Sequence, residues 1–207
     1  MDIPISLPDV PMSLASWGSV DEHFDEIRQF VAATGDADGL TMTAISLLMS
    51  RDSAARALGV DLLGELLRLR LIDVSDFLEV TAGSVSDVDE DVRWAAAVSL
   101  RHGADVAIAD ALIKLAQDPD SDVRFQAVVG LPAACTGEDE IGDEVLEALI
   151  AAAQDSAPEV REWAIFGIAV QSDVDTPRIR QVLTAALDDW ATAEDARAGL
   201  KRRGIPI

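Results

Sequence analysis

Residues 92–100 read Val-Arg-Trp-Ala-Ala-Ala-Val-Ser-Leu, and the pattern returns as Val-Arg-Phe-Gln-Ala-Val-Val-Gly-Leu at 123–131 and Val-Arg-Glu-Trp-Ala-Ile-Phe-Gly-Ile at 160–168. A looser copy runs over 55–63, and a degenerate one lies at 196–197. The arginines of the five copies lie 37, 31, 37 and 36 residues apart. A period of about 30–40 residues indicates stacked supersecondary units. The sequence therefore predicts a repeat protein.

Each copy has the features of a helix. Val92, Ala96 and Leu100 lie four residues apart and therefore share one helical face. Asp89 and Asp120 each precede an arginine by four residues, where a side-chain oxygen can cap the free N–H groups of a helix start. Pro158 suits the first helical position of its own copy. Because no alternating strand pattern bounded by hairpin turns occurs, we expect an all-α fold.

The expected organisation is an arm followed by a helical array. Residues 1–19 contain three prolines, at positions 4, 8 and 11, and are expected to form an extended N-terminal arm. The array should fill 20–207, with a capping helix at 20–34. Five helix pairs follow, and we call the two helices of a pair A and B. Their expected repeats cover about 40–69, 73–102, 105–134, 139–171 and 175–203.

The repeated phrase Asp-x-x-x-Val-Arg-x-x-Ala-x-x-x-Leu, following an acidic or Pro-containing turn, resembles the HEAT repeat. It is similar to the HEAT-like subtype also found in phycobilin lyases. The resemblance covers about 40–203 and implies a right-handed α-solenoid with its B helices along the concave side and atypical units at its ends. It also implies that the arginines pair with Asp in the turn of their own or a neighbouring repeat, with Asp87, Asp118 and Asp155 as available partners.

The charge balance limits the possible partners. The chain has 16 Lys and Arg against 38 Asp and Glu, a formal net charge of −22. Phosphate neutralisation needs the opposite sign, so nucleic acid and an anionic membrane surface are disfavoured. A protein partner is expected, and a basic one is compatible with this charge. The N-terminus has no basic start and no long apolar run, which favours a cytoplasmic protein.

Two sets of residues are candidates for binding. The arginine ladder, Arg56, Arg93, Arg124 and Arg161, is interpreted as structural, with carboxylate or phosphate binding by Arg93, Arg124 and Arg161 as the alternative. Trp94 and Phe125 directly follow their arginines, Trp163 lies two residues after Arg161, and Phe166 lies one turn further along the same helix. At about 100° per residue, the position directly after the arginine lies about 160° round the helix from the apolar stripe. These side chains therefore either pack between successive B helices or face the concave surface, where they could contact a partner.

Catalytic and metal-binding arrangements are not indicated. The Asp-x-Asp-x-Asp runs at 87–91 and 118–122 lack the Gly and Glu that a calcium loop requires. His23 and His102 have no second ligand at metal-site spacing, and nothing near Cys135 supports a nucleophile paired with His102. We therefore expect no catalytic residues, no metal and no cofactor.

Three functions remain open from the sequence. The favoured one is a non-enzymatic scaffold or adaptor that binds a protein on the concave face of an acidic helical array. The second is an acidic immunity or inhibitor protein that neutralises a basic toxin or nuclease. The third is a chromophore lyase subunit, suggested by the repeat subtype alone. The sequence does not identify the partner, the oligomeric state or whether the aromatic side chains are buried.

Overall fold

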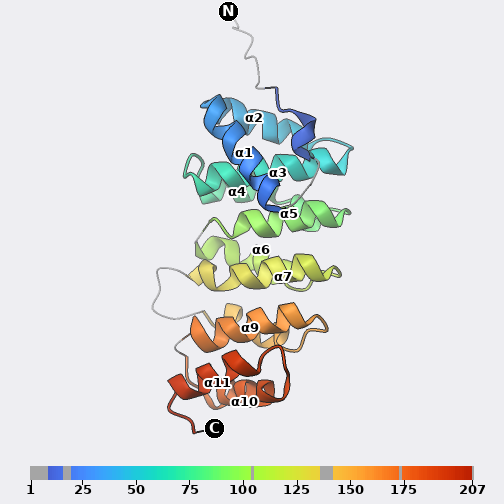
Figure 1. Cartoon of the computed structure of the whole chain (residues 1–207). Coiled ribbons are helices and arrows are strands. Elements are labelled where there is room, and N and C mark those ends of the chain that lie inside the picture. The colour runs from blue at the N-terminus through green and yellow to red at the C-terminus, as the bar shows by residue number, and fades with distance from the viewer. Residues whose placement is uncertain (1–8, 16–19, 104, 136–141, 173, 207) are drawn as a thin grey trace, which may run out of the picture. The chain divides into compact units, whose positions relative to one another are not determined.

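The protein is helical throughout the part that the computed structural model describes, which is residues 9–15, 20–103, 105–135, 142–172 and 174–206 (Figure 1). These residues form eleven α-helices and no β-strand, which confirms the all-α class. The chain divides into two compact units, residues 1–103 and 104–207, and each is described here by itself.

The first unit is built around its longest helix, α3. Its elements are the 3-10 helix Met12–Ala15, α1 (Val20–Thr34), α2 (Ala37–Leu48), α3 (Ser53–Arg68), α4 (Val74–Thr81), the 3-10 helix Ser84–Ser86 and α5 (Glu90–Leu100). Helix α3 is buried at every position from Ala57 to Leu67. It is buried all round because α1, α2, α4 and α5 all pack against it.

Two glycines allow this close packing around α3. A Cβ at Gly59 would lie 2.8 Å from the backbone oxygen of Ala44 in α2. A Cβ at Gly64 would lie 2.2 Å from the Oγ of Ser99 in α5. Real Cβ atoms do not approach other atoms so closely, so these positions hold glycine because the neighbouring helices contact the α3 backbone directly.

The second unit repeats the A and B pairing. Its elements are the 3-10 helix Val106–Ile108, α6 (Ala109–Leu115), α7 (Ser121–Gly130), the 3-10 helix Leu131–Cys135, α8 (Asp143–Ala152), α9 (Pro158–Val170), α10 (Pro177–Ala185), the 3-10 helix Ala186–Asp188 and α11 (Ala193–Arg202). The B helices α7, α9 and α11 are neighbours, and α9 contacts both of the others. The A helices α6, α8 and α10 each pack on the B helix of their own pair.

The predicted helix starts are confirmed. Asp89 Oδ1 accepts a hydrogen bond from the N–H of Asp91, and Asp120 Oδ1 accepts from Asp122 and Val123. Pro158 begins α9. The apolar stripes are buried as expected, with the side chains of Val92, Ala96 and Leu100, and those of Val123, Ala127, Leu131, Val160, Ala164 and Ile168, all excluded from solvent. Burial of these stripes is the main favourable contribution of each repeat to folding.

The N-terminal region differs from the sequence expectation. Within the expected extended arm, Met12–Ala15 form a 3-10 helix and Leu14 is buried, so this part is not extended. The remaining arm residues 1–8 and 16–19 lie outside the described residues, as do 136–141 in the fourth expected repeat. Helix α2 begins at Ala37, before the expected residue 40, because the side chain of Asp36 caps it.

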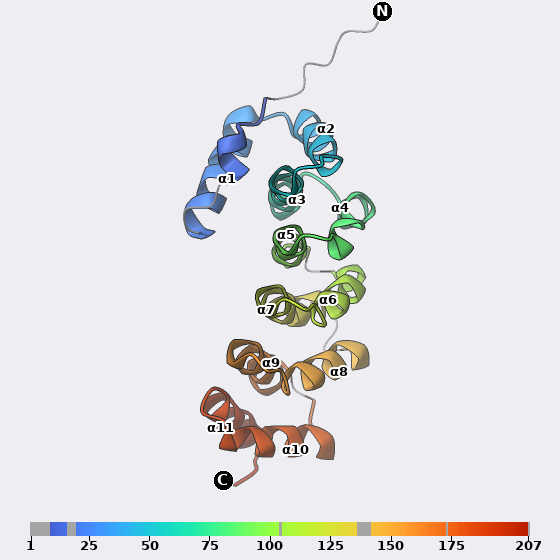
Figure 2. The same ribbon diagram turned by 90° about the vertical axis from the view of Figure 1, so that its right-hand side faces the viewer.

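Helix α1 occupies 20–34 as predicted, and it packs mainly on α3. Within the first unit it lies beside α3 and α5, on the side away from α4 (Figure 2). The apolar face of α1 includes Ile27 and Val31, which are buried. Helix α1 therefore covers part of the B-helix side of its own unit.

Candidate protein-binding surfaces

The ladder arginines contact the turns on either side of them. Arg56 donates from Nε and Nη2 to the carboxylate of Asp87, at 2.8 and 2.7 Å, and from Nη1 to the backbone oxygens of Ser50 and Arg51. Arg124 repeats this arrangement with Asp155, at 2.7 and 2.8 Å. Each of these arginines thus joins the turn before its own helix to the turn of the following repeat.

The two other ladder positions show parts of the same pattern. Arg161 Nε donates to Asp189 at 2.6 Å, and its Nη1 donates to the backbone oxygen of Asp155 at 2.9 Å. Arg93 Nη1 donates to the backbone oxygen of Asp87 at 2.9 Å. Asp189 was not among the partners expected from the sequence. In the earlier turns the Asp lies six residues before the arginine, but Asp189 lies eight residues before its counterpart, Arg197. The repeat spacing therefore did not identify Asp189 as a partner.

These contacts fix the charge of the ladder. The hydrogen bonds from Arg56, Arg124 and Arg161 lower the pKa of Asp87, Asp155 and Asp189 below the usual range of Asp. Both members of each pair are therefore charged at neutral pH. Because the donors of Arg56, Arg124 and Arg161 point at the protein's own carboxylates and carbonyls, these arginines are poorly placed to bind an external anion.

A double-mutant cycle on Arg124→Ala and Asp155→Ala should give a coupling energy of about 1–3 kcal/mol near pH 7. The two side chains are only 13% and 11% exposed, so solvent screens this pair little. The pKa of Asp155 is lowered in the folded state, so the coupling is present above the unfolded-state pKa of about 4 and is lost as the pH falls through the folded-state pKa. Urea unfolding of the parent, the two single variants and the double variant at several pH values measures the coupling energy and its pH dependence.

The exposed pair Arg180 and Asp175 is the matched control, and its coupling should be smaller. Equal coupling in the two pairs, or a coupling for Arg124 and Asp155 that does not change with pH, would contradict this account.

Three aromatic side chains meet on the B helices of the second unit. The rings of Phe125 in α7 and Trp163 in α9 are 6.2 Å apart with an interplanar angle of 85°, and Trp163 and Phe166 are 5.4 Å apart at 67°. Phe125 and Phe166 are half-buried, and Trp163 is 36% exposed. The sequence left open whether these residues pack between repeats or face solvent. The three rings contact one another across α7 and α9, and each ring also remains partly exposed to solvent.

Three carboxylates lie on the same two helices as this aromatic cluster. Asp122 in α7, together with Glu159 and Glu162 in α9, is exposed. A pocket of about 240 Å³ between the starts of α7 and α9 is lined by Phe125 with Asp122 and Glu159 among its walls. We call Phe125, Trp163, Phe166 and these three carboxylates the α7–α9 surface. Aromatic faces beside carboxylates attract cationic side chains.

Trp94 has a different environment from its counterpart Phe125. It lies in the first unit, on α5, and stacks on Phe24 of α1 with the ring centroids 6.3 Å apart and an interplanar angle of 24°. Trp94 is therefore half-buried against a helix of its own unit. The structure brings Phe125, Trp163 and Phe166 into one cluster and places Trp94 in another.

A buried polar pair holds α1 on α3. His23 Nε2 lies 2.9 Å from Asp61 Oδ2, and both side chains are almost fully excluded from solvent. Burial raises the pKa of Asp61, and the hydrogen bond with His23 acts against this rise. Sequence reasoning missed this pair because the two residues are 38 positions apart. The available signal was Asp61 itself, a carboxylate within an otherwise apolar stretch of helix.

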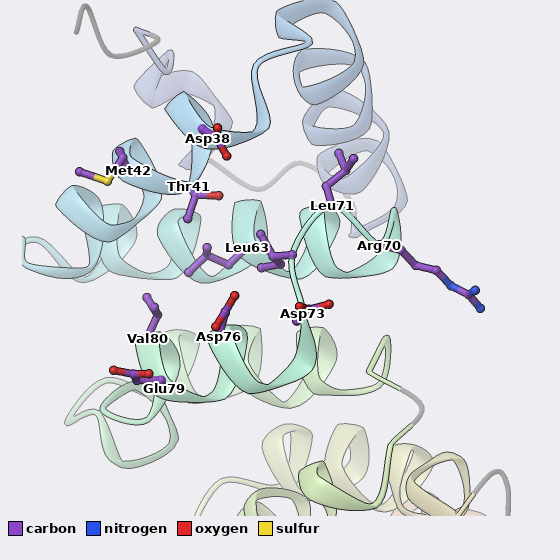
Figure 3. Close-up of a pocket in the computed structure, with 11 residues that line it drawn as sticks. Asp38, Thr41, Met42, Leu63, Arg70, Leu71, Asp73, Asp76, Glu79 and Val80 are labelled. Carbon is purple, nitrogen blue, oxygen red and sulfur yellow. The ribbon is translucent and has the colours of Figure 1, made fainter. Parts of the chain in front are cut away.

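The first unit also contains a groove that the sequence did not indicate. It is lined by α2, α4, Leu63 of α3 and the connection between α3 and α4, and it has a volume of about 620 Å³ (Figure 3). We call it the α2–α4 groove. Its apolar part comprises Met42, Leu63, Leu71, Ile72 and Val80. Its acidic part comprises Asp38, Asp73, Asp76 and Glu79.

Among the described residues, no group of three or more His, Cys, Asp and Glu side chains is arranged to hold a metal ion. His102 is exposed at the end of the first unit, and the side chain of Cys135 lies outside the described residues. No helix in the described part of the chain has the length and hydrophobicity needed to cross a membrane.

Comparison of the sequence with known families identifies the repeats. The profile of the HEAT repeats matches residues 77–169 and 110–201, which together span more than half of the chain. The chain belongs to the HEAT repeat family. The resemblance stated from the arginine phrase is thus confirmed. No match was found among curated proteins.

Solved structures of other helical-repeat proteins resemble this HEAT protein. An archaeal HEAT-like repeats protein from Thermococcus onnurineus has 18% identity and a TM-score of 0.58, over 97% of this chain and 83% of that one. The complex of CpcE and CpcF of phycocyanin lyase from Nostoc has 22% identity and a TM-score of 0.55, over 79% and 97%. A designed armadillo repeat protein in complex with the peptide (KR)4 has 16% identity and a TM-score of 0.59, over 92% and 97%. At these identities the likeness concerns the fold alone.

Proposed function

We propose that this HEAT protein is a non-enzymatic scaffold that binds a basic segment of a partner protein on the α7–α9 surface. The observation that carries the proposal is the cluster of Phe125, Trp163 and Phe166 with exposed carboxylates beside it. Partly exposed aromatic side chains are common anchors of protein interfaces.

The local charges favour a cationic ligand. Arg124 and Arg161, the ladder arginines of the same two helices, donate hydrogen bonds to the carboxylates of Asp155 and Asp189. The carboxylates of Asp122, Glu159 and Glu162 stay exposed at the surface. The local excess of negative charge agrees with the net charge of −22, which would speed encounter with a basic partner.

A solved structure with a similar fold supports this choice of ligand. One structure with a similar fold is a designed repeat protein crystallised with a peptide of alternating Lys and Arg. Stacked helical repeats can therefore present a surface to such a peptide. The peptide is also a practical probe, because it carries cationic side chains and no large apolar ones.

We expect (KR)4 to bind the full chain, and Glu159→Gln combined with Glu162→Gln to weaken binding by about tenfold, equivalent to about 1.4 kcal/mol. Isothermal titration at low and moderate salt measures this, and the affinity should fall as salt rises. The control is Asp110→Asn combined with Glu144→Gln, which removes the same charge from exposed positions on α6 and α8. Equal weakening in both variants, or no saturable binding, would contradict the proposal.

A further inference from the structure

The α2–α4 groove combines two chemistries in one place. Its apolar part includes side chains that remain unusually open to solvent, since Met42 is 53% exposed and Leu71 is 51% exposed. Its acidic part contributes four carboxylates, three of which lie on or next to α4 (Figure 3). Exposed apolar side chains rimmed by charges of one sign indicate an interaction surface more than a structural one.

The carboxylate of Asp73 is not used to cap its helix. Asp73 is the N-cap residue of α4, yet its side chain makes no capping hydrogen bond. Asp36, Asp52, Asp89 and Asp120 occupy the same position in other helices and do accept such a bond. The Asp73 side chain therefore lines the groove without being held in a helix cap.

The single cation at the groove is turned away from it. Arg70 lies two residues after the end of α3 in the left-handed conformation, with φ of 57°, and the N–H of Leu71 donates to the carbonyl of Leu66 at 2.9 Å. At the end of α11 a glycine, Gly204, takes this position with φ of 69°. A non-glycine residue costs about 1 kcal/mol here. The turn directs Leu71 to the groove and the Arg70 side chain into solvent (Figure 3).

We propose that the α2–α4 groove docks one face of a cationic amphipathic helix from a partner protein. Apolar side chains of that helix would pack on Met42, Leu71 and Val80, and flanking Lys or Arg would meet Asp38, Asp76 and Glu79. Docking would relieve the mutual repulsion of the four carboxylates, a gain that an anionic or neutral ligand could not provide.

The shape of the groove supports a helix as the occupant. The walls are two helices, α2 and α4, and a helical ligand commonly lies in such a groove with side chains spaced three and four residues apart. The Met42 side chain is flexible and polarisable, which lets it adapt to ligand side chains of different shape. This site lies in the first unit and is independent of the α7–α9 surface in the second.

The test uses a synthetic amphipathic helix made only of Leu and Lys, labelled with a dye and titrated with the full chain. Asp76→Asn combined with Glu79→Gln should weaken binding by about tenfold, because two of the four carboxylates are lost. Met42→Gln, which keeps the side-chain length, should weaken it by about threefold through the loss of apolar contact. Both sites are solvent-exposed, so the melting temperature should not change.

The same control as above, Asp110→Asn with Glu144→Gln, changes the net charge equally and should leave the affinity nearly unchanged. Equal weakening by the control would show that the peptide responds only to the overall charge and would overturn the proposal. Weakening by Glu159→Gln with Glu162→Gln alone would assign the peptide to the α7–α9 surface and would also overturn it. Binding of (KR)4 tests the proposed function at the α7–α9 surface, whereas binding of the Leu and Lys helix tests the α2–α4 groove. Either proposal can therefore fail without the other.

Discussion

The Asp61→Ala variant is expected to lose about 3–5 kcal/mol of unfolding free energy in the first unit. Asp61 and His23 are buried together, with 2.9 Å between Oδ2 and Nε2. Removing the carboxylate leaves the imidazole of His23 without this partner in an apolar environment and leaves a cavity beside α3. Urea unfolding of the full chain, followed by hydrogen exchange in α1 and α3, measures the loss and locates it.

Two further variants separate the pair from simple packing. Asp61→Asn keeps the size and one hydrogen-bonding oxygen and should cost less than Asp61→Ala. The double variant His23→Leu with Asp61→Leu removes both polar groups and should recover most of the stability, because buried pairs can be replaced by apolar side chains at little cost. A loss below about 1 kcal/mol for Asp61→Ala would contradict the buried pairing of α1 and α3.

Gly64→Ala is the second change with a large expected effect, a loss of about 2–3 kcal/mol. The new Cβ would lie 2.2 Å from Ser99 Oγ, 2.6 Å from Ser99 Cβ and 3.2 Å from Ser99 Cα, so α3 and α5 must move apart. The higher helix propensity of Ala, worth about 1 kcal/mol, opposes this loss but is smaller than the packing cost. Thermal and urea unfolding give the net change.

The neighbouring residue offers a direct rescue. The double variant Gly64→Ala with Ser99→Gly adds a methyl group on α3 and removes the Ser99 side chain that it would contact on α5. This variant should restore part of the lost stability. Gly83→Ala is the control, since Gly83 has φ of −67° and nothing within 4 Å of its Cβ position, so it should be neutral or slightly stabilising. An unchanged unfolding free energy in the Gly64→Ala variant would show that α3 and α5 are not in backbone contact.

Most of the fold could be predicted because its determinants are local in sequence. The stripe of Val92, Ala96 and Leu100, the capping residues Asp89 and Asp120, and the spacing of the arginines all act within one repeat or between adjacent repeats. Such features repeat, and repetition makes them visible in a single sequence.

The features that could not be predicted depend on contacts without a repeated pattern. The pairing of His23 with Asp61 joins α1, which is not part of a repeat, to the first repeat, and Phe24 of the same helix stacks on Trp94. The α2–α4 groove depends on the left-handed turn at Arg70, which no sequence rule assigns to an arginine. Asp189 was not predicted because it lies eight residues before Arg197, whereas the Asp of the earlier turns lies six residues before its arginine.

The central claim is that the α7–α9 surface binds a basic protein segment through its aromatic cluster. The most direct measurement is the dissociation constant of (KR)4 for the Trp163→Ala chain, beside Trp190→Ala as the control. Trp190 is 84% exposed and lies outside the cluster. The account predicts about tenfold weaker binding for Trp163→Ala, unchanged binding for Trp190→Ala, and melting temperatures close to the parent protein for both. Unchanged affinity in Trp163→Ala, or a loss of affinity that merely follows a collapse of its melting temperature, would contradict it.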